Sequence, residues 1–405
     1  MIKFLVIEQD LRVSGTSQGI ISRSFLGKLR SANPKATIDV VYLKQSPSSD
    51  QLELLPVNNI ETHVLNLKIP FFTKWYNKLY WRLFHVSLKE RHIHNVYASY
   101  ISKVDYQKYD HIFIRSAGLE HETILGSRGL PILNKAIVNF HDPYPLFWYP
   151  GTKSELNDLE VFSLKRMQSV VSQAKRCMSS SSLMSEDLQF LYGSKKKFYT
   201  LPHQYCSSVF DLSDYSKSLE KSKKVMITYH GALMFGRNLK ILLDSYEELV
   251  NASNFYKEKT EFVLRIKGEG TEELIKKYSA NENIVILDML DFSNSAYEQI
   301  HLSDINIVLE NGPLYSNTLV GKAPFLASID KPILSISPKR SELNKIVDDK
   351  QYIANVKDKN EIKQKLEHLI IDRLNLNHPV NPFGDYFSDE NFKLMLDRIL
   401  EGKDD

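Results

Sequence analysis

Val225-Met-Ile-Thr-Tyr-His-Gly231 and Phe262-Val-Leu-Arg-Ile-Lys-Gly268 are two apolar stretches that each run into a glycine turn and then into a helical pattern. A third apolar stretch follows at 305–309. Parallel sheets build phosphate and nucleotide sites at such places, because glycine admits a close approach of the backbone and a helix start offers free N–H groups. The pattern therefore predicts parallel strands with an anion site at their ends.

The residues after the first glycine mark where the next helix starts. Arg237 and Asn238 stand directly before a run of apolar residues at helical spacing, namely Leu239, Leu242, Leu243, Tyr246, Leu249 and Val250. Arg237 and Asn238 are therefore predicted at the mouth of this helix, where a diphosphate would bind. The alternative is that Arg237 is an ordinary surface arginine at a helix start.

The N-terminal half shows the same alternation of strands and helices. A glycine loop from Gly15 to Gly19 follows the first predicted strand, and the predicted strands lie at 4–7, 38–43, 111–114 and 136–140. Helices are predicted at 20–29, at 185–191 after a loop at 179–182, and at 390–400 after a breaker segment. The expected domains are 1–205 and 206–385, both Rossmann-like, and a C-terminal helical segment, 386–405.

Composition limits the class of protein. The chain has 405 residues, 42% of them hydrophobic, and a net charge of +3, which suits a globular protein and gives no reason to expect nucleic acid as a partner. Its two cysteines, Cys177 and Cys206, fit a reducing cytoplasm and argue against a zinc site. The start is too short and too soon acidic for a signal peptide, and no apolar run is long enough to span a bilayer.

Two α/β halves facing a cleft, with a C-terminal helix crossing back to the first half, resemble the GT-B glycosyltransferases, and most closely their large retaining branch, which uses nucleotide sugars. Four stretches carry the resemblance: Tyr229–Asn238, Lys267–Gly270, Ser303–Leu309 and Gly321–Leu334. The resemblance implies a nucleotide-sugar donor on the second half and an acceptor on the first. It implies no cofactor, and the absence of an Asp-x-Asp motif after a strand suggests no metal.

The resemblance also implies a donor site. Gly231, Arg237, Asn238 and Gly268 would surround the diphosphate, with Gly15 approaching from the first half. The second basic residue usual after the first glycine is replaced by Ala232, and Lys322 is expected to supply that charge.

The retaining branch usually carries two glutamates eight positions apart, and here those columns hold Asn317 and Phe325. Glu310 is the expected substitute, while Asn317 and Thr318 are expected to hydrogen-bond phosphate or sugar. Ser341 and Glu342 either bind ribose or cap the helix that follows.

Two strand ends of the first half carry further candidates. His141 and Asp142 follow the strand at 136–140, and the resemblance places a histidine here near the reacting sugar. Asp142 is a candidate base for an acceptor hydroxyl if the enzyme inverts. The alternative is that both residues stabilise a proline turn. Arg115 closes another strand and either reaches an anionic acceptor or forms a plain salt bridge.

An aromatic stripe at 71–84, which includes Trp75, is flanked by basic residues such as Lys78. Between residues 68 and 108 there are eight Lys or Arg and only two acidic residues. This pattern indicates either a helix that docks on an anionic membrane or an ordinary core helix of the first domain.

The sequence thus predicts a cytoplasmic, metal-independent glycosyltransferase of surface-polysaccharide type, with a peripheral position at the inner face of the membrane if the stripe docks there. It would transfer a sugar from a nucleotide diphosphate sugar to a glycan or lipid-linked glycan. Retention of configuration is implied by the resemblance alone. A catalytically silent protein that binds a sugar nucleotide or glycan, and a sugar-nucleotide epimerase, are the alternatives.

Overall fold

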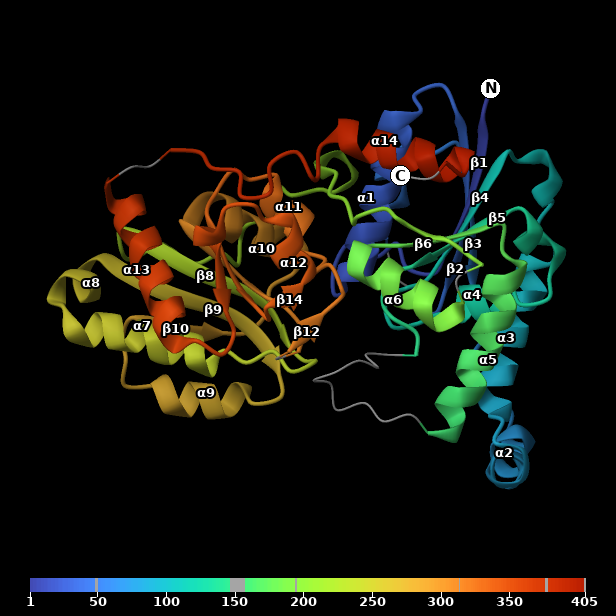
Figure 1. The fold of residues 1–405 in the computed structure, drawn as a ribbon, viewed down its shortest axis with the longest axis horizontal. Coiled ribbons are helices and arrows are strands. Elements are labelled where there is room, and N and C mark those ends of the chain that lie inside the picture. The colour runs from blue at the N-terminus through green and yellow to red at the C-terminus, as the bar shows by residue number, and fades with distance from the viewer. Residues whose placement is uncertain (48–49, 146–156, 194, 313, 376–377, 404–405) are drawn as a thin grey trace. The chain divides into compact units, whose positions relative to one another are not determined.

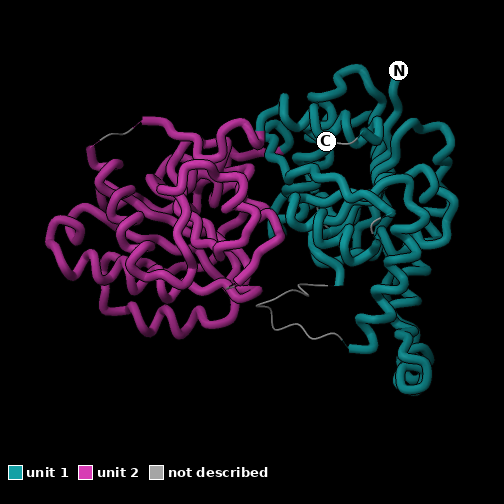
Figure 2. Tube along the Cα trace, in the orientation of Figure 1, with its two compact units in different colours: residues 1–148, 153–209, 388–405 teal, residues 149–152, 210–387 magenta. Residues whose placement is uncertain are grey.

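A computed structural model of the protein describes residues 1–47, 50–145, 157–193, 195–312, 314–375 and 378–403. Contacts between backbone positions divide the described residues into two compact units (Figure 2). Unit 1 holds the described residues up to 209 together with 388–403, and unit 2 holds those from 210 to 387.

Unit 1 is built on a seven-stranded parallel sheet in the order β3-β2-β1-β4-β5-β6-β7. Its strands are β1 (Lys3–Glu8), β2 (Thr37–Lys44), β3 (Asn59–Val64), β4 (His111–Arg115), β5 (Ala136–Phe140), β6 (Arg176–Ser179) and β7 (Phe198–Thr200). The inner strands are mostly apolar because both faces of a parallel sheet are covered, and all five residues of β5 are buried.

The helices of unit 1 are α1 (Ser17–Ala32), α2 (Phe71–Phe84), α3 (Leu88–Ile101), α4 (Glu122–Gly126), α5 (Asp158–Gln173), α6 (Ser182–Tyr192) and α14 (Asp389–Glu401) (Figure 1). The Thr16 side chain caps α1 by accepting from the backbone N–H of Gly19. The last helix packs on the first unit as predicted, since Phe392 meets Phe25 of α1 edge-on with ring centres 6.4 Å apart.

Unit 2 has a six-stranded parallel sheet in the order β10-β9-β8-β11-β13-β15 and a small second sheet of β12 and β14. The strands are β8 (Val225–Leu233), β9 (Thr260–Gly268), β10 (Ile284–Leu287), β11 (Ile305–Leu309), β12 (Tyr315–Ser316), β13 (Ile333–Ser337), β14 (Arg340–Ser341) and β15 (Ile353–Asn355). The helices are α7 (Lys240–Ala252), α8 (Asn254–Lys259), α9 (Thr271–Tyr278), α10 (Phe292–Tyr297), α11 (Ala323–Ala327), α12 (Glu342–Ile346) and α13 (Lys359–Asn375).

The predicted fold class, α/β with two parallel Rossmann-like sheets, is confirmed. One local prediction is wrong. The segment 179–182 is not simply a loop, because β6 pairs with β5 as far as Ser179 and α6 begins at Ser182. The Ser181 side chain caps this helix by accepting from the N–H of Met184, so a serine run that suggested a loop is the boundary between two elements.

Candidate functional site

The sheet of unit 2 reverses its strand order between β8 and β11. Doubly wound sheets bind ligands outside the carboxyl ends of the strands at this reversal. Gly231 lies near the end of β8, and Glu310 follows β11 directly. Two residues predicted from the sequence therefore lie at strand ends beside the reversal point.

Lys322 and Arg237 lie around Gly231. The Lys322 ammonium donates to the carbonyl of His230 and lies 4.3 Å from the ring centre of Tyr229. A Cβ added to Gly231 would come within 3.1 Å of that ammonium, so a side chain here would crowd it. Arg237 donates from Nη1 to the carbonyl of Ala232 at 3.2 Å. The structure thus brings the predicted pair of cations to one glycine.

The charges of this pair are not balanced. Burial, together with the neighbouring Arg237, lowers the pKa of Lys322 well below its ordinary value. In the described part of the chain no ion pair joins a carboxylate to Lys322 or Arg237, and Nε of Arg237 is buried without a hydrogen-bond partner. Arg265, by contrast, holds Glu298 through two hydrogen bonds of 2.5 and 3.0 Å. An anion at Gly231 would relieve the repulsion between the two unpaired cations.

The loop that carries Arg237 connects β8 to α7. Phe235 in this loop has φ +56°, a left-handed conformation that is uncommon for a bulky residue and is found at functional loops. The Asn238 side chain accepts from the N–H of Lys240 and so orders the start of α7. Gly268 has a structural reason to be glycine, because a Cβ there would lie 2.5 Å from the carbonyl oxygen of Leu233 on the paired strand. A donor contact for Gly268 stays a prediction.

Glu310 lies in a buried carboxylate site. Burial and, less strongly, the nearby Glu342 raise its pKa, hydrogen bonding from Ser337 and Ser341 opposes the shift, and the net value is about 7. Its Oε1 accepts from the N–H of Leu343 at 3.3 Å, whereas Oε2 has no hydrogen-bond partner among the described residues. A carboxyl group with such a pKa can exchange a proton near neutral pH.

The other predicted donor residues of unit 2 are enclosed. Ser341 caps α12 by accepting from the N–H of Asn344, and Glu342 is fully buried in the first turn of that helix. The capping alternative for Ser341 is therefore what the structure shows, and ribose binding stays a prediction.

Asn317 and Thr318 are also buried, and the Thr318 hydroxyl donates to Asn317 at 3.4 Å. Phe325, in the second glutamate column of the resemblance, packs against Phe292 in the core with ring centres 5.8 Å apart. An acidic residue in that column would have to replace a core aromatic ring.

His141 of unit 1 is the centre of a buried hydrogen-bond network. Its Nε2 accepts from Arg115 at 2.9 Å and from Asn139 at 3.0 Å, and its Nδ1 faces the side-chain amide of Gln18. Because Arg115 and Asn139 can only donate from these atoms, Nε2 is an accepting nitrogen of the ring. Burial and the nearby Arg115 lower the pKa of His141 well below its ordinary value, which keeps the ring neutral. The catalytic role expected of His141 stays a prediction.

Arg115 forms the plain salt bridge that was the alternative to acceptor binding. Its Nε lies 2.8 Å from Glu8, both side chains are buried, and its guanidinium stacks 3.8 Å from the ring centre of Phe25. Asp142 is half-buried, and a Cβ on Gly118 would lie 3.2 Å from its carboxylate. Gly15 has φ +84° with open space around it, so its backbone conformation requires glycine.

Sequence reasoning missed several members of these networks. Glu8 and Gln18 meet Arg115 and His141 only through the arrangement of β1, α1, β4 and β5, which no local pattern gives, whereas Asn139 is a sequence neighbour of His141. Tyr229 had a signal, since a tyrosine before the His-Gly of a predicted strand end could have been proposed to line the site. No three His, Cys, Asp or Glu side chains in the described residues come together as a metal site, and metal independence stays an expectation.

Solved structures share this architecture along nearly the whole chain. Sucrose-phosphate synthase from Thermosynechococcus elongatus is 10% identical with a TM-score of 0.62, and the match covers 99% of this chain and 95% of that one. The lipopolysaccharide outer core galactosyltransferase WaaB in its apo form is 10% identical with a TM-score of 0.59, and the match covers 99% of both chains.

UDP-GlcNAc 2-epimerase from Neisseria meningitidis bound to UDP-GlcNAc is 12% identical with a TM-score of 0.53, and the match covers 99% of this chain and 100% of that one. No protein-family model and no curated protein sequence matches the chain. The protein therefore has the GT-B fold, which glycosyltransferases and epimerases share.

Proposed function

We propose that the protein is a glycosyltransferase that moves a sugar from a nucleotide diphosphate sugar to a glycan or lipid-linked glycan acceptor in surface-polysaccharide synthesis. The transfer would need no metal and would retain the configuration of the sugar. The second predicted domain, residues 206–385, would bind the donor, and the first, residues 1–205, would bind the acceptor. The observation that carries the proposal is the pair Arg237 and Lys322, two cations without carboxylate partners in the described structure.

The chemistry of the leaving group explains the need for this pair. When the sugar departs, the nucleoside diphosphate gains negative charge, and prearranged cations stabilise that charge most in a site shielded from water. Diphosphate binding would also favour the charged form of Lys322, which burial disfavours. Glu310, with a pKa of about 7, is proposed to transfer or hold a proton near the reacting sugar. His141 and Asp142 are proposed to position the acceptor.

Donor binding and donor hydrolysis test the proposal together. A panel of nucleoside diphosphates and nucleotide sugars should include one that raises the melting temperature, because a ligand at a hundred times its dissociation constant stabilises by about 2.7 kcal/mol. Slow release of free nucleoside diphosphate from the same donor is expected from a transferase. Tight binding without turnover, even with glycan acceptors present, would instead support the catalytically silent alternative, which the side chains at Asn317 and Phe325 favour.

An epimerase is the second candidate, because the UDP-GlcNAc 2-epimerase bound to UDP-GlcNAc shares the fold along the whole chain. Proton NMR of UDP-GlcNAc incubated with the protein distinguishes the two reactions. Appearance of the C2 epimer without an acceptor identifies an epimerase, whereas unchanged stereochemistry with release of UDP identifies sugar transfer to water.

A further inference from the structure

Helix α2 presents its apolar side to solvent. Seven large hydrophobic residues of this helix are between 50 and 75% exposed, namely Phe71, Phe72, Trp75, Tyr76, Leu79, Leu83 and Phe84. No residue of α2 is buried, so the interpretation of this stripe as core is wrong. In Figure 1 the helix is seen end-on beside the ends of α3 and α5, apart from the sheet of unit 1.

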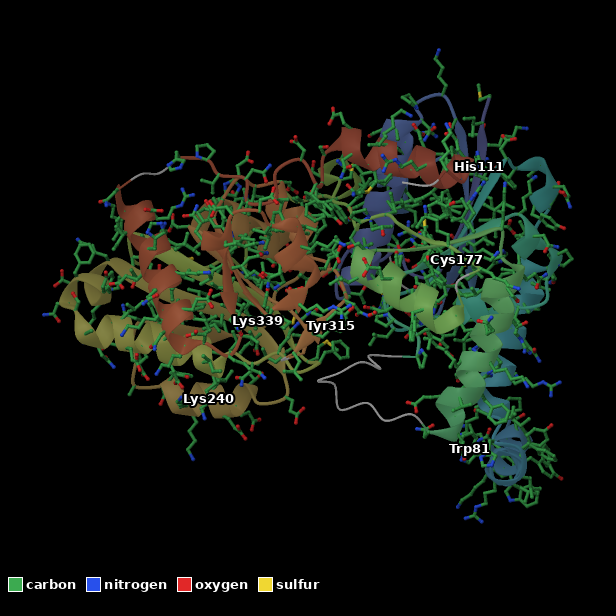
Figure 3. The ribbon with its side chains drawn as sticks, viewed as in Figure 1. Trp81, His111, Cys177, Lys240, Tyr315 and Lys339 are labelled. Carbon is green, nitrogen blue, oxygen red and sulfur yellow. The ribbon has the colours of Figure 1, made fainter. Side chains whose placement is uncertain are left out.

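The side of α2 that faces the protein holds both polar and aromatic residues. Thr73, Asn77 and Trp81 are less exposed than the apolar stripe, and the Asn77 side chain accepts from the N–H of Lys89 at the start of α3. Trp81, labelled in Figure 3, contacts the His85 ring with centres 5.8 Å apart. The attachment of α2 to unit 1 therefore leaves the stripe free, whereas an ordinary surface helix buries its apolar face.

Cationic side chains flank the exposed stripe. Lys74, Lys78 and Arg82 repeat every four residues along one edge of α2, and the helix has no acidic residue. Lys78 and Arg82 border a shallow hollow that Trp75, Tyr76 and Leu79 also line. Aromatic rings with adjacent cations suit the boundary between lipid headgroups and acyl chains, where the rings enter the apolar layer and the cations meet anionic headgroups.

We propose that α2 is a docking helix that holds the protein reversibly on an anionic lipid surface. The helix would lie on the membrane surface rather than cross the bilayer. No helix in the described part of the chain is long and apolar enough to cross a membrane. The docking does not depend on the proposed sugar transfer, since it uses a separate surface of unit 1.

A second copy of the chain is a poorer occupant of this surface. Fourteen helical residues extend about 21 Å. One helix face about 10 Å wide therefore offers on the order of 200 Å², against about 800 Å² per partner in a stable protein interface. The absence of acidic residues on α2 also means that two copies would bring like charges together.

Vesicle binding of the full chain tests the docking. Phosphatidylglycerol-containing vesicles should carry the protein in a flotation assay at low salt, and phosphatidylcholine vesicles should not. Lys78→Gln combined with Arg82→Gln should weaken binding on the order of 25-fold, because each cation contributes roughly fivefold against an anionic surface. Trp75→Ser combined with Leu79→Ser should weaken binding at both low and high salt, whereas the effect of the charge variant should vanish at high salt.

Matched controls separate α2 from general surface properties. Lys35→Gln with Lys257→Gln removes the same charge from exposed sites outside α2, and Phe190→Ser removes an exposed aromatic ring on α6 that is 91% exposed. Both controls should bind vesicles like the parent protein. Three results would overturn the proposal: an equal loss of vesicle binding in the controls and the α2 variants, no binding of the parent protein to anionic vesicles, or a dimer in light scattering that the α2 substitutions dissociate. Melting temperatures should stay unchanged, because no α2 side chain is buried.

Discussion

Replacing Arg237 or Lys322 by methionine tests the candidate donor site most directly. Methionine keeps an unbranched stem and removes the charge, so packing over Tyr229 changes little at Lys322. A charge-assisted hydrogen bond contributes about 1.5–3 kcal/mol, which corresponds to about 10- to 150-fold in affinity. The diphosphate affinity of Arg237→Met should fall by a factor within this range. Lys322→Met should lose affinity near the lower end of this range, because burial disfavours the ammonium and so offsets part of what its charge contributes to binding.

The assay is isothermal titration with the nucleoside diphosphate that gives the largest thermal shift, and with the corresponding nucleoside. Both variants should bind the diphosphate more weakly and the nucleoside as the parent protein does. Titration in two buffers with different ionisation enthalpies should show proton uptake by the parent at alkaline pH and none by Lys322→Met. Lys257→Met, an exposed site elsewhere in unit 2, is the matched charge control.

Stability gives an independent reading of the same variants. Burial makes the charged form of Lys322 costly, so ligand-free Lys322→Met should melt at a higher temperature than the parent at a pH where the parent's amine is protonated. A structural lysine would instead show a lower melting temperature and equal losses for diphosphate and nucleoside. Two results would refute the assignment of Arg237 and Lys322 to an anion site. One is an equal loss of affinity for diphosphate and nucleoside in both variants, and the other is an unchanged diphosphate affinity in both.

Three further perturbations have defined outcomes. Burial raises the pKa of Glu310 from 4.5 to about 7, so its contribution to stability is complete below pH 4.5 and is lost as pH rises through 7, about 3 kcal/mol in all; denaturant titrations across pH should show a loss smaller by this amount in Glu310→Gln than in the parent, since buried Glu8, whose pKa is also raised to about 7, titrates in both proteins. Arg115→Met leaves Glu8 buried without its cation and should cost about 3–5 kcal/mol, most of which Glu8→Gln should restore in the double variant. His141→Ala should lower turnover while leaving the donor dissociation constant unchanged, with about 1–3 kcal/mol of lost stability from its unpaired neighbours; unchanged turnover would make the residue purely structural.

The sequence revealed strands best where they are buried on both faces. The limits predicted for β5 and β11 agree with the structure, because five consecutive buried residues leave an apolar run bounded by polar ones. The edge strand β3 escaped prediction since none of its residues is buried and its sequence, Asn-Ile-Glu-Thr-His-Val, lacks such a run. β6 escaped because it has only four residues, with arginine first and serine last.

The sequence predicted which residues lie at a strand end, but not which residues of other elements contact them. Arg237 and Lys322 were assigned to one site through the resemblance, and the approach of Lys322 to Gly231 follows from the position of the start of α11 next to β8. The neighbours of His141 could not be predicted, because Gln18 and Arg115 reach it through the order β1-β4-β5 in the sheet. Strand order depends on the packing of the whole unit, so it cannot be predicted from local periodicity.

The two sheets reverse at equivalent places, and the charges at those places differ. In unit 1 the reversal lies between β1 and β4, and Glu8 at the end of β1 pairs with Arg115 at the end of β4. That cation is neutralised by the protein itself. In unit 2 the reversal lies between β8 and β11, where Arg237 and Lys322 lie near Gly231 and no described carboxylate pairs with either. A positive charge that is buried away from water is unfavourable unless an anion pairs with it. The same topology therefore favours an anionic ligand in unit 2, whereas in unit 1 the cation at the reversal already has a protein partner.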